Sequence, residues 1–209
     1  KITPPLCSEA IRHQWVKCLT LAHRLSPPHA LPSTNPHVLL SPYMQYASSH
    51  PRSAKSAGGC RVAAFMVLSS IFKDEVLGAK YIRALLPEII MLCHGGLRSS
   101  GEKDVCHRKH AINCAISTMM AWRDAPSPIV VKQDDSPQKF FVSSCNRVED
   151  KVLIECVKIL KKTGDDKFPE VRALGAEFAS VLSSMSIAEE HGRSSKREFN
   201  ALTFLDDIM

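Results

Sequence analysis

Two neighbouring segments carry residue types that often bind metal ions. Cys93-His94 closes one predicted helix, and Cys106-His107-x-x-His110 opens the next. Cys106 and His110 are four positions apart, so a helix places them on one face, and zinc accepts Cys and His at such spacing. The eight cysteines form no CxxC pair, however, and most lie beside Ile, Val and Ala, where a thiol acts as a small hydrophobe. We therefore expect buried cysteines with surface histidines, and neither a metal site nor a cofactor.

Motifs for catalysis are missing from the sequence. It contains no Gly-x-Ser-x-Gly elbow and no Gly-rich phosphate loop followed by Lys-Ser or Lys-Thr. We therefore predict that the chain is not an enzyme and has no catalytic residues. Disulfide scaffolds of secreted proteins are short and rich in loops, and this chain is neither, so its cysteines predict a reducing compartment, the cytoplasm or the nucleus.

The elements that must position these residues are helices. Apolar residues recur at helical spacing along most of the chain, and no alternation with period two persists. We predict an all-α fold, with helices or helix pairs around 8–25, 37–73, 76–122 and 146–188. Residues 124–145 hold three prolines and are predicted to be a loop insertion.

An arginine recurs at one position of the second helix in each pair. Arg12, Arg61, Arg108 and Arg172 are 49, 47 and 64 residues apart, and the last interval is longer by about the length of segment 124–145. Three positions after these arginines, the last three units carry a small residue: Ala64, Ala111 and Gly175. Helices that cross closely need a small side chain there, and an arginine can reach acids of a neighbouring unit. A period near 47 with two helices per unit is typical of stacked helical repeats.

The repeated pattern resembles HEAT repeats, which are close relatives of armadillo repeats. Their second helix carries a Val-Arg-x-x-Ala type of signature after a turn that often holds Asp, and their first helix often contains Leu-Pro. The matching residues are Asp165-Asp166 with Val171-Arg172, Asp104 with Arg108 and Ala111, and Leu86-Pro87. The resemblance implies an α-α superhelix of about three to four antiparallel helix pairs over residues 1–188. It also implies a non-catalytic scaffold or adaptor that binds protein partners within a larger assembly.

The first unit starts at its second helix. Arg12 carries the signature of a second helix, and no first helix precedes it in the sequence. We therefore expect the chain to be the C-terminal part of a larger repeat protein.

The net charge of +6 is concentrated in the N-terminal third. The first 61 residues hold seven Lys or Arg and a single acid, Glu9, whereas the remaining residues are balanced. Nucleic-acid association through this basic third is the alternative function, because phosphate contacts need such charge. The charges form no run, which favours a solvated face.

The C-terminal segment 189–209 differs from the repeats. A basic linker precedes apolar residues that recur every three positions: Phe199, Leu202, Leu205 and Ile208. We predict a short amphipathic helix that caps the exposed end of the array or binds a partner. No membrane-spanning helix is expected, because the longest apolar run, residues 62–68, is far shorter than the roughly 20 residues needed.

Overall fold

The computed structural model describes residues 9–25, 36–48, 56–98, 104–125 and 139–190, which form seven helices. Within these ranges there is no strand, so the prediction of an all-α fold is confirmed. The helices are α1 (Glu9–Leu25), α2 (Pro36–Ser48), α3 (Ser56–Lys73), α4 (Glu75–Gly96), α5 (Val105–Asp124), α6 (Lys139–Gly164) and α7 (Pro169–Glu190).

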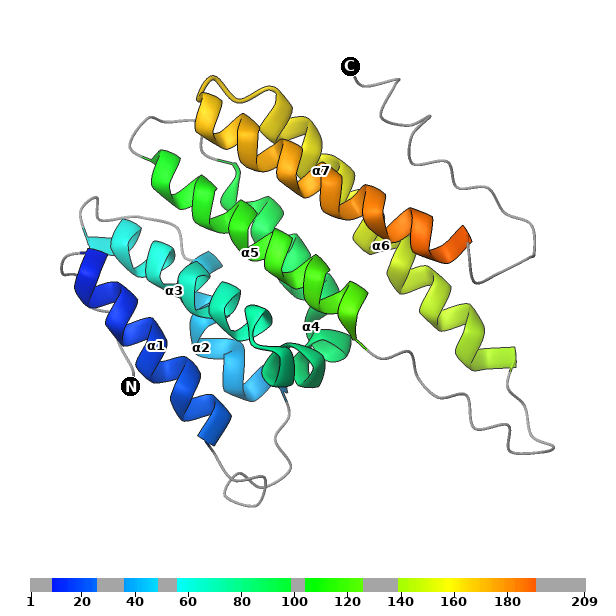
Figure 1. The fold of residues 1–209 in the computed structure, drawn as a ribbon, viewed down its shortest axis with the longest axis horizontal. Helices are drawn as coiled ribbons and strands as arrows, with labels where there is room; N and C mark the ends of the chain where they lie inside the picture. Colours follow the sequence, from blue (N-terminus) through cyan, green and yellow to red (C-terminus); the bar gives the residue numbers. More distant parts are fainter. Residues whose placement is uncertain (1–8, 26–35, 49–55, 99–103, 126–138, 191–209) are drawn as a thin grey trace.

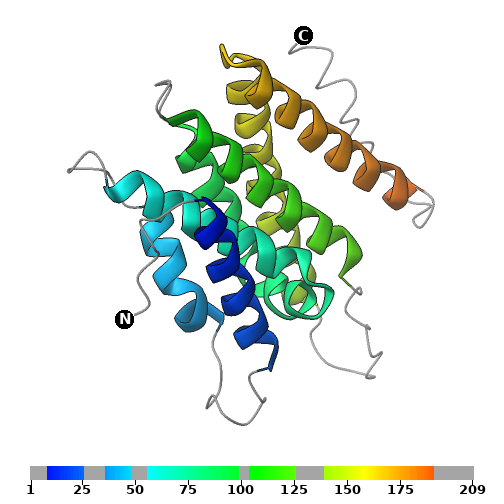
Figure 2. The same ribbon diagram turned by 60° about the vertical axis from the view of Figure 1, so that its left-hand side comes forward.

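The helices form two layers. The odd-numbered helices α1, α3, α5 and α7 lie side by side in one layer, and α2, α4 and α6 form the second layer behind them (Figure 1 and Figure 2). Consecutive helices pair across the layers as α2 with α3, α4 with α5, and α6 with α7. Helix α1 packs mainly on α3 and touches the second layer only slightly, at α4 and at α2, where His23 Nε2 lies 3.3 Å from the Tyr43 hydroxyl. Helix α1 therefore forms one edge of the odd-numbered layer, and no described helix of the second layer pairs with it as α2 pairs with α3.

The breaks between helices follow local sequence. A single residue, Asp74, separates α3 from α4, and its carboxylate accepts hydrogen bonds from the backbone N–H groups of Val76 and Leu77. This satisfies two of the N–H groups that the start of a helix leaves unpaired. Pro87 lies inside α4, which continues past it to Gly96.

The predicted loop over residues 124–145 is wrong at both ends. Helix α5 continues through Asp124, and α6 begins at Lys139, so the last seven residues of the expected insertion, 139–145, are helical. The physical reason is that Pro137 is the last proline of the segment, and residues 139–145 contain neither Pro nor Gly that would end a helix. Residues 126–138, together with the predicted tail helix and its residues Phe199, Leu202, Leu205 and Ile208, lie outside the described residues.

Small residues allow the paired helices to approach closely. A Cβ atom added to Gly96 at the end of α4 would lie 2.8 Å from the Cβ of Ala111 on α5. In the last pair, a Cβ atom added to Gly175 on α7 would lie 2.6 Å from the Cβ of Thr163 on α6 and would also overlap its hydroxyl. Ala64 and Ala111, the other small residues of the repeat signature, are completely buried. These positions therefore set how tightly the helices pack.

We expect Gly175→Ala to lower the free energy of unfolding by about 1–3 kcal/mol, the usual cost of overpacking a core. The Thr163 side chain cannot turn into solvent to make room, because it is only 1% exposed. Urea unfolding checks this result, with Gly95→Ala as the matched control because nothing lies within 4 Å of an added Cβ there. The control should be neutral or slightly stabilising, since Ala favours a helix over Gly. Equal stability changes in the two variants would contradict the role assigned to Gly175.

Candidate protein-interaction site

The signature arginines of α3 and α5 contact acids that precede the next helix of the same layer. Arg61 Nη2 on α3 lies 3.7 Å from Asp104 Oδ1, directly before α5. Arg108 Nε on α5 lies 2.8 Å from Asp166 Oδ2 in the turn before α7. Both arginines are buried. Each ion pair therefore joins one helix pair to the next, as expected for an arginine that reaches an acid of a neighbouring unit.

Arg108 has the densest set of contacts among these arginines. Its Nη2 donates a 3.3 Å hydrogen bond to Asp166 Oδ1, and its guanidinium lies 5.4 Å from the centre of the Phe168 ring. The Asp166 carboxylate also accepts the backbone N–H of Phe168, and its carbonyl oxygen accepts a 2.7 Å hydrogen bond from Arg172 Nη1. Arg172 is exposed, unlike Arg108, and only the helical position of Arg12 is described, not its side chain. The Arg108–Asp166 pair thus organises the turn between α6 and α7.

The second layer is linked by two histidine–glutamate contacts. His37 Nδ1 on α2 lies 3.1 Å from Glu88 Oε2 on α4, and His94 Nδ1 on α4 lies 2.6 Å from Glu155 Oε2 on α6. Burial lowers the pKa of His94, although Glu155 opposes this shift. A hydrogen bond from Lys158 is the main reason why the pKa of Glu155 is lowered. Neighbouring helices of both layers therefore share polar contacts.

The cysteines and histidines considered as metal ligands lie apart. Cys93 is buried and shares a side-chain hydrogen bond with Cys114, whereas Cys106 is exposed. Burial raises the pKa of Cys93 well above its usual value, so its thiol stays protonated. The expectation of a surface histidine is wrong for His107, which is buried because its position on α5 packs against the Phe65 ring of α3. His110 is half-buried, and no group of three or more potential ligands within the described ranges is arranged to hold a metal ion.

A shallow groove of about 540 Å³ opens on the surface between α2 and α4. Its lining includes Met44, Met91 and Leu92, together with the His37–Glu88 pair at one side. Met91 is 60% exposed. Methionine side chains are flexible and suit surfaces that adapt to different partners. The groove combines apolar and polar lining residues, which makes it a candidate contact site for a protein.

Sequence reasoning missed this groove, although a signal for it exists. In α4 the buried positions include 85, 86, 89, 90 and 93, which form one helical stripe. Met91 falls outside that stripe, on the same side as Ala84 and Glu88, both of which are exposed. An apolar residue on the polar face of a helix indicates a contact site. The sequence could not show, however, that α2 forms the other wall of the groove.

The basic N-terminal third is partly neutralised in the structure. Arg24 Nη1 lies 3.7 Å from Asp74 Oδ2, and Arg61 is buried beside Asp104. Two of the seven basic residues in this third therefore face acids from later parts of the chain. The remaining described cation, Lys17, is exposed.

Comparison of the chain with protein-family models, with curated proteins and with solved structures finds no match. Among the helices that the structure describes, none combines the length and the apolar character needed to cross a bilayer. The functional argument therefore depends on the geometry of the helices and their surfaces.

Proposed function

We propose that the chain is a non-catalytic protein-interaction scaffold or adaptor, built from HEAT-like repeats that stack as an α-α superhelix. The observation that carries the proposal is the relation between the Arg61–Asp104 and Arg108–Asp166 pairs. The arginines occupy the same position in successive helix pairs, and each meets an acid in front of the next helix of its layer. A recurring contact of this kind is what a stack of equivalent units requires, since each unit contacts mainly its neighbours.

Proteins of this architecture act through extended surfaces. The groove between α2 and α4 is lined by two methionines and a leucine together with five polar residues. An amphipathic segment of a partner protein suits such a groove, because its apolar side chains can enter while its polar face stays in water. We therefore place partner binding on this surface, in a protein that acts in the cytoplasm or nucleus as part of a larger assembly.

Nucleic-acid association is the less well supported alternative. Such binding requires cations that are free to meet phosphates. The contacts of Arg24 and Arg61 with Asp74 and Asp104 reduce the positive potential that the N-terminal third can present.

We expect Met91→Glu to reduce partner capture several-fold without changing the fold, because Met91 is exposed and lines the groove. The measurement is affinity capture of the full chain from nuclease-treated cell extract, with quantitative mass spectrometry. Ile154→Glu is the matched control, since Ile154 on α6 is 55% exposed and lies outside the groove. Equal capture by both variants would remove the groove from the proposal, and loss of all captured protein after nuclease treatment would favour the nucleic-acid alternative.

A further inference from the structure

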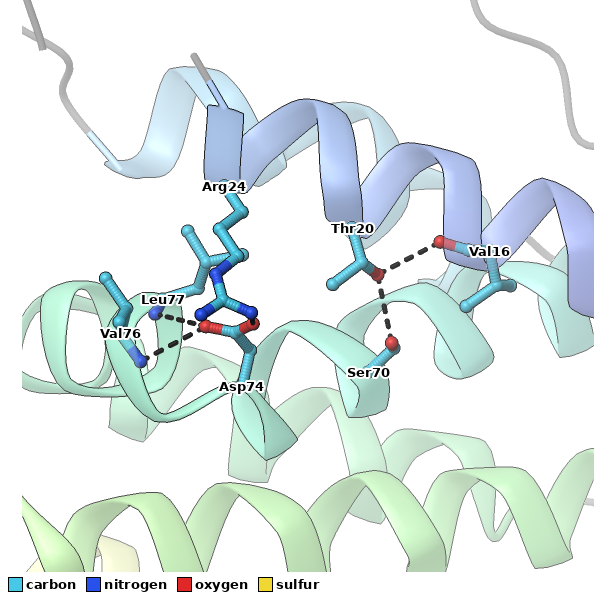
Figure 3. Close-up of polar contacts among 7 residues, drawn as sticks. All are labelled: Val16, Thr20, Arg24, Ser70, Asp74, Val76 and Leu77. Atoms are coloured by element: carbon cyan, nitrogen blue, oxygen red, sulfur yellow. Dashed lines mark hydrogen bonds and ion pairs between the residues drawn. The ribbon is translucent and has the colours of Figure 1, made fainter. Parts of the chain in front are cut away.

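Helix α1 is held in place by one face only. Val16 is buried, and Thr20 Oγ1 makes a 2.9 Å hydrogen bond with Ser70 Oγ on α3. At the end of α1, Arg24 lies beside Asp74, the residue that caps α4 (Figure 3). These contacts fix the orientation of α1 against α3 and the start of α4.

The opposite face of α1 is exposed and mostly apolar, with the polar residue Gln14 among its apolar side chains. Ile11, Cys18, Leu21 and Leu25 recur at intervals of seven, three and four residues, which places them in one stripe along a helix. Ile11 is 53%, Leu21 54% and Leu25 69% exposed. The stripe lies on the side of α1 opposite to the buried Val16. Its spacing matches the seam by which one helix packs on another.

The other edge of the same layer has a different surface. The exposed residues along α7 include Ala173, Ala176, Ser180 and Ser184, and no large apolar side chain of the described part of α7 is exposed. This edge can face water without cost, whereas the α1 edge leaves large apolar side chains in water. A docking helix therefore gains more buried apolar area on α1 than on α7.

The charges next to the stripe indicate the chemistry of its occupant. Lys17 is an exposed cation of α1 beside the stripe, and no acid is among the described side chains of α1. A second α1 packed on the stripe would bring like charges together. An apolar helix with acidic neighbours is complementary to this face.

The chain itself contains such a segment. Residues 198–209 hold Phe199, Leu202, Leu205 and Ile208 at regular spacing, three acids, and no Lys or Arg. We propose that this segment docks as a helix on the α1 stripe of a second copy of the chain. The proposal does not depend on the scaffold function.

The connection length favours a second copy over the same molecule. Glu190 ends α7, and α1 is three helix positions away in the layer (Figure 1). Neighbouring helices are about 8–10 Å apart, so the tail must cross about 24–30 Å. The link from 190 to 198 covers at most about 26–29 Å when fully extended. Docking within one molecule would leave no slack to pass around α3 and α5, whereas a second copy faces no such limit.

The test measures the mass of the full chain by size-exclusion chromatography with light scattering, over a range of micromolar concentrations. We expect the wild type to associate, and Leu21→Asp and Leu202→Asp each to give a single chain. Leu21 is exposed, so its substitution leaves the packed face of α1 unchanged, which circular dichroism verifies. Ile154→Asp, at an equally exposed position on α6, should associate like the wild type.

Mixing the two monomeric variants makes the test specific. The Leu202→Asp chain keeps an intact α1, and the Leu21→Asp chain keeps an intact tail, so their mixture should form a complex of two chains through the remaining good contact. A wild type that stays monomeric would overturn the proposal. So would association that survives Leu202→Asp, because it would then use a surface other than the tail.

Discussion

Replacing Arg108 with methionine is expected to lower the free energy of unfolding by about 3–5 kcal/mol. Arg108 is only 1% exposed, and its guanidinium neutralises Asp166, which is itself largely buried. Methionine fills much of the same volume but leaves the carboxylate without its cation. The cost comes mainly from this uncompensated charge rather than from the loss of favourable attraction. Urea unfolding followed by circular dichroism measures the change.

Arg172→Met is the matched control for this prediction. Arg172 contacts the same turn, because it donates to the carbonyl oxygen of Asp166, but its side chain is exposed. Exposed polar contacts contribute little, so the control should change stability by less than about 1 kcal/mol. A loss for Arg108→Met as small as that of the control would show that the buried ion pair does not organise the turn.

The second large effect concerns pH. Burial and the neighbouring Arg61 guanidinium lower the pKa of His107 from 6.5 to about 4. The unfolded chain therefore takes up a proton at this histidine near pH 6.5, whereas the folded chain does so only near pH 4. Between these values the unfolded state binds more protons, so stability falls as the pH falls. The difference in pKa corresponds to a loss of about 3 kcal/mol by pH 4.

His107→Val removes this titration and places an apolar side chain at the buried position. We expect the variant to lose much less stability than the wild type between pH 6.5 and pH 4, measured by urea unfolding at each pH. His23 and His94 also have pKa values lowered by burial, so they provide the alternative explanation. An unchanged slope in His107→Val, together with a flattened slope in His94→Gln, would assign the effect to the second layer instead.

Local sequence predicted the helices well and the loop poorly. Apolar spacing is a property of short segments, so the predicted helix 8–25 and the predicted start at residue 76 lie within one residue of α1 and of the start of α4. The loop prediction for residues 124–145 was wrong at its C-terminal end, because prolines oppose a helix only near their own positions. The helix begins soon after Pro137, where no residue opposes it.

The contacts of the candidate site could be predicted only in part. The repeat alignment indicated that an arginine of one unit reaches an acid of another, and Arg108 meets Asp166 across 58 residues of sequence. It could not show that His107 would be buried, because that depends on where Phe65 of the preceding pair lies. The α2–α4 groove was missed for the same reason, since its two walls come from different helix pairs.

The Arg108–Asp166 contact also affects how the protein unfolds. Arg108 belongs to the pair α4–α5, and Asp166 belongs to the pair α6–α7. If α6 and α7 separate from α5, the buried Arg108 guanidinium loses the carboxylate that neutralises it. The contact with α5 therefore raises the free energy needed to open α6 and α7. Helices α5, α6 and α7 should behave as one cooperative unit, rather than as hairpins that open and close independently.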